Sequence, residues 1–350
     1  MAVIQLRYFQ RGFARRVSAR AVQPQAKRRS RIVRRSSTSA QSSTDRSVSG
    51  SRASSTSFIS EDATIEDGVE IGPYCVIGPS VVIGSGTKLH GHNCILGNVT
   101  IGERNTFLNG ATVGSEEDGG DVIIGHGNRF GHFCTVGVRC ADMKYNPEDP
   151  GHLKIGNQND IREYVGIHCS SSGSTLTEIG DQNLLMGTVH IGHDSKLGNQ
   201  NIIANGSMLA GHVVLGNRVV VGGACAIAQR CWVGSFSMLG GGSMVVMDVP
   251  PYVRVQGDRA KIRGLNVVQF ARSGFSEDEK AALSRCYKDL WLSRKSGPIR
   301  SIREKLDDIV EGKKYEDSVH CQHLIDFIND SVNTTSNLRS KSMCSPLKLE

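Results

Sequence analysis

Aliphatic residues recur every six positions from Ile179 to Val245. The series is Ile179, Leu185, Ile191, Leu197, Ile203, Leu209, Leu215, Val221, Ile227, Val233, Leu239 and Val245. An α-helix cannot use this spacing, because its faces recur every 3.6 residues. A hexapeptide parallel β-helix can, since each hexad makes one short wall and one tight corner, where small residues and glycine fit. The pattern predicts an all-β solenoid rather than a sandwich.

Three hexads make a triangular coil of 18 residues, so residues 18 apart lie above one another at roughly 4.8 Å. The same phase runs from Ile65 to Val113 and resumes at Ile124 and Ile155. Three segments interrupt it, namely 115–121, 139–154 and 170–178. The last two flank one coil, and long loops that leave a regular scaffold often line a site.

The solenoid is expected to stop at Pro250 and Pro251, because proline cannot donate to a further strand. Ser276 and Glu279 then have the spacing of a capping box, and apolar periodicity predicts helices over 276–295, 299–312 and 317–331. We therefore expect a transit or disordered segment (1–57), a parallel β-helix (58–250), a connector (251–275), a helical domain (276–332) and a loose tail (333–350).

The net charge of +7 comes from the first residues of the chain. Residues 1–44 contain no acid, and Arg7, Arg11 and Arg15 recur at helical spacing opposite Phe9 and Phe13. An Arg-rich, acid-poor amphipathic segment is typical of an organelle transit peptide. The density of arginine favours the mitochondrion over the plastid. The alternative is a basic arm that binds nucleic acid or anionic lipid.

Without that segment the chain is mildly acidic, so its charge gives no reason to expect nucleic acid as a partner. No apolar run approaches the roughly 20 residues of a membrane span. Four of the ten cysteines, Cys75, Cys134, Cys225 and Cys231, occupy the small-residue position of a hexad, and no CxxC pair occurs. We expect buried thiols in a reducing or neutral compartment.

Polar residues gather on one edge of the coils by the 18-residue rule. His212 should lie above Asp194, Gly211 should lie above His193, and His190 is nearby. A histidine can take a proton from a hydroxyl, a carboxylate can orient it, and a glycine N–H can stabilise an oxyanion. The alternative is a set of corner residues that only face solvent.

Zinc is a second possibility, because His190 and His193 could supply two nitrogens and another subunit a third. The spacing of three, the lack of a second histidine pair two coils away and the position of Asp194 beside the base argue against it. We therefore expect no metal.

Several motifs resemble one family. They are Asn183-Leu184-Leu185-Met186, His190-Ile191-Gly192-His193-Asp194, Leu209-Ala210-Gly211-His212, Asp142-Met143-Lys144-Tyr145, Asp248-Val249-Pro250-Pro251-Tyr252-Val253 and Gly264-Leu265-Asn266. Over roughly residues 58–330 the chain is similar to the UDP-N-acetylglucosamine O-acyltransferases, the first enzymes of lipid A synthesis. The resemblance implies a left-handed β-helix that forms a homotrimer with sites between subunits.

The resemblance also implies the reaction. An (R)-3-hydroxyacyl group would pass from the phosphopantetheine of acyl carrier protein to the 3-hydroxyl of UDP-N-acetylglucosamine, with no further cofactor. His193 would be the general base, Asp194 its partner and the Gly211 N–H the oxyanion donor. Asp142 and Lys144 would reach the site from a neighbouring subunit. Other expected substrate contacts are His168, His190, His212, Gln229, Asn266 and Arg272, and Gly241 would leave room for a longer acyl tail.

Four positions depart from the family pattern: Ala228 before Gln229 replaces a histidine, Ser273 after Arg272 replaces an arginine, Ala141 replaces a glutamine and Glu61 replaces a histidine. These departures put substrate affinity, nucleotide choice and acyl length in doubt. Three alternatives also stay open: the related N-acyltransferase acting on UDP-3-O-acylglucosamine, a γ-carbonic-anhydrase-like assembly subunit, and an inactive trimeric scaffold.

Overall fold

The computed structural model describes residues 46–48, 50–117, 120–292 and 301–333. The predicted transit segment up to residue 45 and the predicted tail from residue 334 lie outside these ranges. Part of the first and second predicted C-terminal helices, over residues 293–300, lies outside them as well.

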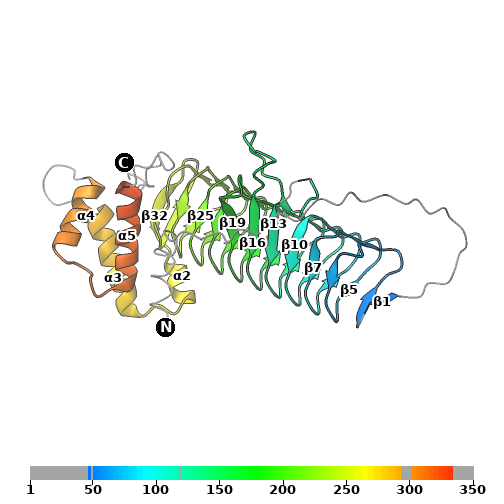
Figure 1. The fold of residues 1–350 in the computed structure, drawn as a ribbon. Coiled ribbons are helices and arrows are strands. Elements are labelled where there is room, and N and C mark those ends of the chain that lie inside the picture. Colours follow the sequence, from blue (N-terminus) through cyan, green and yellow to red (C-terminus); the bar gives the residue numbers. More distant parts are fainter. Residues whose placement is uncertain (1–45, 49, 118–119, 293–300, 334–350) are drawn as a thin grey trace, which may run out of the picture. The chain divides into compact units, whose positions relative to one another are not determined.

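Three sheets of mainly parallel strands form the walls of the predicted solenoid, and the chain visits them in the order A, B, C (Figure 1). Sheet A contains β1 (Arg46–Val48), β2 (Ser51–Ala53), β5 (Glu70–Ile71), β8 (Lys88–Leu89), β11 (Thr106–Phe107), β14 (Arg129–Phe130), β17 (Asp160–Ile161), β20 (Leu184–Leu185), β23 (Ile202–Ile203), β26 (Val220–Val221), β29 (Met238–Leu239), β31 (Val253–Gln256) and β32 (Lys261–Leu265). Sheet B contains β3 (Phe58–Ile59), β6 (Val76–Ile77), β9 (Cys94–Ile95), β12 (Thr112–Val113), β15 (Thr135–Val138), β18 (Gly166–His168), β21 (His190–Ile191), β24 (Met208–Leu209), β27 (Ala226–Ile227) and β30 (Met244–Val245). Sheet C contains β4 (Thr64–Ile65), β7 (Val81–Ile83), β10 (Asn98–Ile101), β13 (Asp121–Ile124), β16 (His152–Ile155), β19 (Leu176–Ile179), β22 (Lys196–Leu197), β25 (Val214–Leu215) and β28 (Trp232–Val233).

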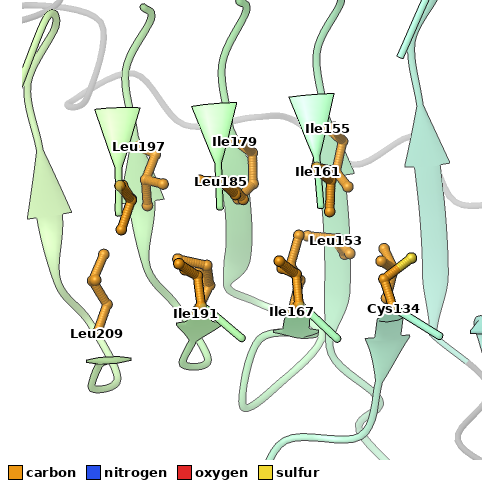
Figure 2. Packing of buried hydrophobic residues seen from close by; sticks show 14 of the residues in the cluster. Cys134, Leu153, Ile155, Ile161, Ile167, Ile179, Leu185, Ile191, Leu197 and Leu209 are labelled. Carbon is orange, nitrogen blue, oxygen red and sulfur yellow. The ribbon is translucent and has the colours of Figure 1, made fainter. Parts of the chain in front are cut away.

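The core is the stack of inward residues that the period of six predicts. In sheet A, Leu185 pairs with Ile203 and Ile203 with Val221, which confirms the 18-residue coil. Figure 2 shows inward side chains of successive coils, among them Ile167, Ile191 and Leu209, lying in rows inside the solenoid. Each is almost fully buried, and burial of one such side chain contributes about 1.5–3 kcal/mol. The cysteines that the structure describes are free thiols, and the four at small-residue positions are buried, as expected.

A ladder of buried asparagines runs up the corner between sheets C and A. The Oδ1 atom of Asn159 accepts hydrogen bonds from the Nδ2 and the backbone N–H of Asn183, and Asn159 in turn donates from both its nitrogens to Asn128 Oδ1. The ladder satisfies backbone groups that the corner would otherwise leave unpaired.

The three interruptions in the pattern all leave the solenoid at one corner, between sheets B and C, which we call the BC corner. They lengthen the coil, so that Ile101 pairs with Ile124, Ile124 with Ile155, and Ile155 with Ile179. The predicted loop 139–154 projects from the solenoid here (Figure 1, green). Its Asp149 Oδ1 accepts a hydrogen bond from the backbone N–H of Gly173, which joins it to the third loop.

Both ends of the solenoid differ from the predicted boundaries. β2 pairs in parallel with β5, so the solenoid begins before residue 58. At the other end β31 adds another parallel strand after the two prolines, and β32 then pairs with it in antiparallel fashion. Proline removes a backbone donor only at its own position, so the chain returns to sheet A once past Pro251.

The C-terminal helices follow the prediction closely. They are α2 (Val267–Arg272) within the predicted connector, α3 (Glu277–Tyr287) continuing into the π-helix η2 (Lys288–Leu292), α4 (Ile302–Glu311) and α5 (Val319–Asn333). The capping box of Ser276 and Glu279 is formed. Ser331 of α5 donates to the buried Asp248 at the end of the solenoid, which ties α5 to the last coil. Among the described residues, no helix has the length and apolarity that a membrane span requires.

Candidate active site

The centre of the site is His193 and Asp194, which form the BC corner between β21 and β22. His193 Nδ1 lies 2.7 Å from Asp194 Oδ2, and both residues are less than a tenth exposed. Burial alone would raise the pKa of Asp194, but hydrogen bonds from His193, Thr175 and Ser171 hold it well below its usual range. The carboxylate is therefore ionised and can only accept. His193 Nδ1 must carry the proton, which leaves the Nε2 lone pair free to act as a base.

Gly211 lies directly above His193, as the 18-residue rule predicts. A Cβ added to Gly211 would stand 2.5 Å from His193 Nε2, so only glycine leaves the ring in place. The backbone N–H of Gly211 donates no hydrogen bond within the described residues. It is thus available to a ligand atom beside the base, as an oxyanion donor must be.

His212 completes the cluster on the same corner. Its backbone N–H donates to the His193 carbonyl, its Nε2 lies 3.6 Å from Asp194 Oδ2, and its ring stands edge-on to His193. Burial lowers the pKa of His212 despite the nearby Asp194 carboxylate, and the positive charge of Arg230 adds to this lowering. Near pH 7 the ring is neutral and can bind substrate as donor or acceptor.

His190 faces outward from sheet B rather than into the corner. It stands at one end of an apolar pocket of about 350 Å³ on this sheet, whose other lining residues are Met208, Leu209, Ala210, Ala226, Ile227, Ala228 and Met244. The ring of His168 lies 5.0 Å from that of His190, and its Nδ1 contacts the Arg139 carbonyl. Burial and the neighbouring histidines lower the pKa of His190.

The loop after β15 brings Asp142 toward the corner, where its charge acts on His212. The predicted contact of Asp142 and Lys144 with the site of a neighbouring subunit stays a prediction, because the structure contains one chain. Lys144 is exposed on the same loop, and its backbone N–H donates to Asp142 Oδ1.

Three other predicted residues lie away from the His193 corner. Gly241 lies at the opposite edge of sheet B, at the corner that leads into β30. Arg272 is exposed at the end of α2. Asn266 is buried, and its side-chain amide donates to the Phe236 carbonyl at a third corner. This hydrogen bond orients the Asn266 side chain, and the substrate contact expected of Asn266 stays a prediction.

Arg230, which follows the exposed Gln229, was not among the predicted site residues. Arg230 is 18 residues after His212 and 36 after Asp194, so the coil rule places all three in one column. Its backbone N–H donates to the Gly211 carbonyl. The spacing that identified His212 would also have identified this cation.

Three residues of the site have ligand atoms close enough to hold a metal. Those of His193, Asp194 and His212 lie within 4.8 Å of one another. The set differs from the His190 and His193 pair considered from the sequence. Asp194 already accepts hydrogen bonds from His193 and Ser171, and Arg230 places positive charge beside the group, so the electrostatics suit an anionic substrate better than a cation.

The chain matches known proteins over most of the described residues. Residues 248–336 match the family described as Udp N-acetylglucosamine O-acyltransferase, Domain 2, and residues 62–95 match the bacterial transferase hexapeptide repeat. A Burkholderia orbicola acyl-[acyl-carrier-protein]--UDP-N-acetylglucosamine O-acyltransferase is 36% identical over 54% of this chain and 71% of its own length. A probable mitochondrial enzyme of the same name from Arabidopsis thaliana is 40% identical over 68% of this chain and 70% of its own length.

Solved structures agree with these matches. The Arabidopsis UDP-N-acetylglucosamine acyltransferase superposes with a TM-score of 0.80 at 39% identity, covering 84% of this chain and all of that one. The Francisella novicida enzyme gives 0.66 at 29% identity, covering 84% and 94%. The solenoid is accordingly the left-handed parallel β-helix that the motifs implied. With the His-Asp corner and the helical domain in place, the chain belongs to the UDP-N-acetylglucosamine O-acyltransferase family.

Proposed function

We propose that this protein transfers an (R)-3-hydroxyacyl group from acyl carrier protein to the 3-hydroxyl of UDP-N-acetylglucosamine. The observation that carries the proposal is the alignment of an ionised Asp194, the His193 imidazole and the open Gly211 N–H on one corner. This set can deprotonate a hydroxyl and stabilise a tetrahedral oxyanion, as acyl transfer requires. The names of the relatives supply the identity of the two substrates.

The steps follow from the geometry. His193 Nε2 accepts the proton of the sugar hydroxyl as its oxygen attacks the thioester carbon. The Gly211 N–H donates to the carbonyl oxygen while it carries negative charge, and Asp194 stabilises the imidazolium. The carbon–sulfur bond then breaks, the ester forms, and the proton on His193 passes to the departing thiolate of the phosphopantetheine.

The pocket on sheet B supports the assignment of an acyl donor. It adjoins His190, and its lining is mostly Ala, Met, Leu and Ile. Ala228, which replaces the family's histidine, contributes to this apolar wall. Burial of an acyl chain there would release about 0.8 kcal/mol per methylene. Gly241, at the far edge of the same sheet, would leave space for a longer tail.

We also propose that the enzyme is a homotrimer in the mitochondrion. The apolar outward residues Ile202, Met208 and Met244 on sheets A and B are exposed in one chain, and exposed apolar surface of this kind favours association. The Arg-rich N-terminus and the name of the Arabidopsis relative support the organelle.

The test is an acyl-transfer assay with purified protein beginning near residue 46, 3-hydroxyacyl carrier protein of several chain lengths, and UDP-N-acetylglucosamine. Wild type and His193→Ala are compared with and without a chelator. Product from wild type alone, unaffected by chelator, supports the proposal. Loss of product on chelation would favour a metal at His193, Asp194 and His212. Absence of product at every chain length would reject the transferase in favour of a scaffold.

A further inference from the structure

The column of residues on the BC corner continues one coil beyond the proposed catalytic set. Asp194, His212 and Arg230 occupy the same position in three successive coils, and each has a positive φ, at 59°, 58° and 65°. Because stacked coils are about 4.8 Å apart, the backbone of Arg230 lies about one coil above His212 and two above Asp194.

Backbone hydrogen bonds fix Arg230 relative to the oxyanion donor. The Arg230 N–H donates to the Gly211 carbonyl at 3.1 Å, and the His212 N–H donates to the His193 carbonyl at 2.8 Å. The position of Arg230 is therefore set by the same turns that hold the base. Its side chain is half-buried, and its charge acts on the His212 ring.

The neighbouring positions favour a ligand contact for this cation. Ala226 and Ala228, which precede Arg230 in the same coil, line the apolar pocket on sheet B. Arg230 follows Ala228 by two residues, so a cation stands close to the end of this apolar wall. Guanidinium binds phosphate with two parallel hydrogen bonds, and such bonds are about twice as strong as neutral ones.

We propose that Arg230 is a substrate-binding residue that holds a phosphate group of a substrate one coil above His212. The inference rests on the proposed function, in which both substrates carry phosphate. The phosphate belongs either to the diphosphate of the sugar nucleotide or to the phosphodiester of the carrier's phosphopantetheine. Both present the same chemistry to a guanidinium.

The experiment compares Arg230→Gln and Arg230→Lys with wild type. Arg104→Gln is the matched control, because Arg104 also lies at a solenoid corner with positive φ, 53°, but in an N-terminal coil. KM and kcat are measured separately for UDP-N-acetylglucosamine and for 3-hydroxyacyl carrier protein. Binding of UDP and of 4′-phosphopantetheine is measured by calorimetry without turnover. Melting temperatures are recorded for every variant.

Arg230→Gln is expected to raise KM for one substrate about ten- to hundredfold, with a smaller change in kcat, and to weaken calorimetric binding of the matching probe equally. Arg230→Lys should recover part of that affinity, since it restores the charge without the planar fork. If the Arg230→Gln variant binds UDP more weakly, Arg230 holds the diphosphate of the sugar nucleotide. If it binds phosphopantetheine more weakly, Arg230 holds the phosphodiester of the carrier.

Two outcomes would overturn the inference. In the first, wild type is active and Arg230→Gln has unchanged KM values and unchanged binding of both probes. Arg230 would then not bind substrate, while the proposed function would stand. A lower melting temperature with unaltered binding would make the arginine structural. Wild type that neither turns over nor binds either probe would reject the proposed function, and the inference with it.

Discussion

His193 Nε2 points at the Cα of Gly211 in the coil above, so closely that an added methyl carbon would stand 2.5 Å from it. The His193 ring therefore leaves no room for a side chain at residue 211. Neither could be replaced by a larger group without moving the other, because the coil spacing is set by backbone hydrogen bonds.

Gly211→Ala should abolish most of the activity without unfolding the protein. The backbone of Gly211 is not in the left-handed region, so alanine is tolerated locally, but its methyl group displaces the His193 ring. Loss of general base catalysis lowers kcat about 10²–10⁴-fold. The measurement is steady-state acyl transfer together with a thermal melt.

Gly78→Ala is the control for this change, since an added Cβ there meets nothing closer than 3.4 Å. It should leave kcat unchanged. Equal activity in Gly211→Ala and wild type would show that the His193 geometry does not govern the rate.

Ala226→Leu should shorten the acyl chain that the enzyme accepts. Ala226 lines the apolar pocket beside His190, and a leucine would occupy part of its 350 Å³. We expect a drop in kcat/KM of about tenfold or more for the longest chains and little change for the shortest, because each excluded methylene forfeits about 0.8 kcal/mol. Competition assays with mixed acyl carriers measure the ratio.

Thr112→Leu tests whether any added leucine on sheet B has this effect. Thr112 in β12 lies in the same outward column of sheet B as Ala226, several coils below the pocket. A uniform loss at all chain lengths in Ala226→Leu, or the same profile in Thr112→Leu, would contradict an acyl pocket.

His323 should make the protein less stable as the pH falls below about 6.5. Burial and the neighbouring His320 lower its pKa to about 4, and Tyr252 lies 2.8 Å from its Nδ1. Between pH 6.5 and pH 4 the unfolded chain binds more protons at this histidine than the folded chain does. The free energy of unfolding therefore decreases as the pH is lowered through this range, and it keeps its full value above pH 6.5. Because His323 as a residue keeps some contact with solvent, we expect this loss of unfolding free energy to be about 1–2 kcal/mol.

The check is urea unfolding at pH 7 and pH 5, at constant protein concentration, for wild type and His323→Gln. The free energy of unfolding should decrease less in the variant than in wild type between pH 7 and pH 5. The difference in the pH dependence should correspond to the uptake of at most one proton on unfolding. The exposed His132→Gln serves as the control. An unchanged slope in His323→Gln would mean that other histidines carry the dependence.

Asn159→Ala should destabilise the solenoid by roughly 3 kcal/mol. It removes the oxygen that accepts two hydrogen bonds from Asn183 and leaves these two buried donors unpaired, each at a cost of about 1–3 kcal/mol. Asn128 Oδ1 loses the side-chain donor but keeps the backbone N–H of residue 159. Chemical denaturation measures the change.

Gln182→Ala provides the comparison in the exposed glutamine ladder on the same corner, where Gln182 bonds to Gln158 and Gln200. Water replaces those bonds, so a change within about 0.5 kcal/mol is expected. Equal effects at the two positions would contradict the importance of burial.

The amino-acid sequence determined the coil and much of the site. A period of six predicts three walls and three corners in each coil, and the 18-residue repeat then places Gly211 over His193 and His212 over Asp194. The same 18-residue spacing places Arg230 one coil above His212. These relationships are local and periodic, so arithmetic on residue numbers recovers them.

Tertiary structure decided what the period does not encode. Loops of different length interrupt the repeat, so only the folded chain shows that all three leave at the BC corner and that the charge of Asp142 acts on His212. The solenoid also resumes past Pro251, because β29 offers a free edge to β31. Asn266 bonds to Phe236 for a similar reason: packing of α2 against the last coils is a contact between distant segments, and no spacing in the sequence specifies it.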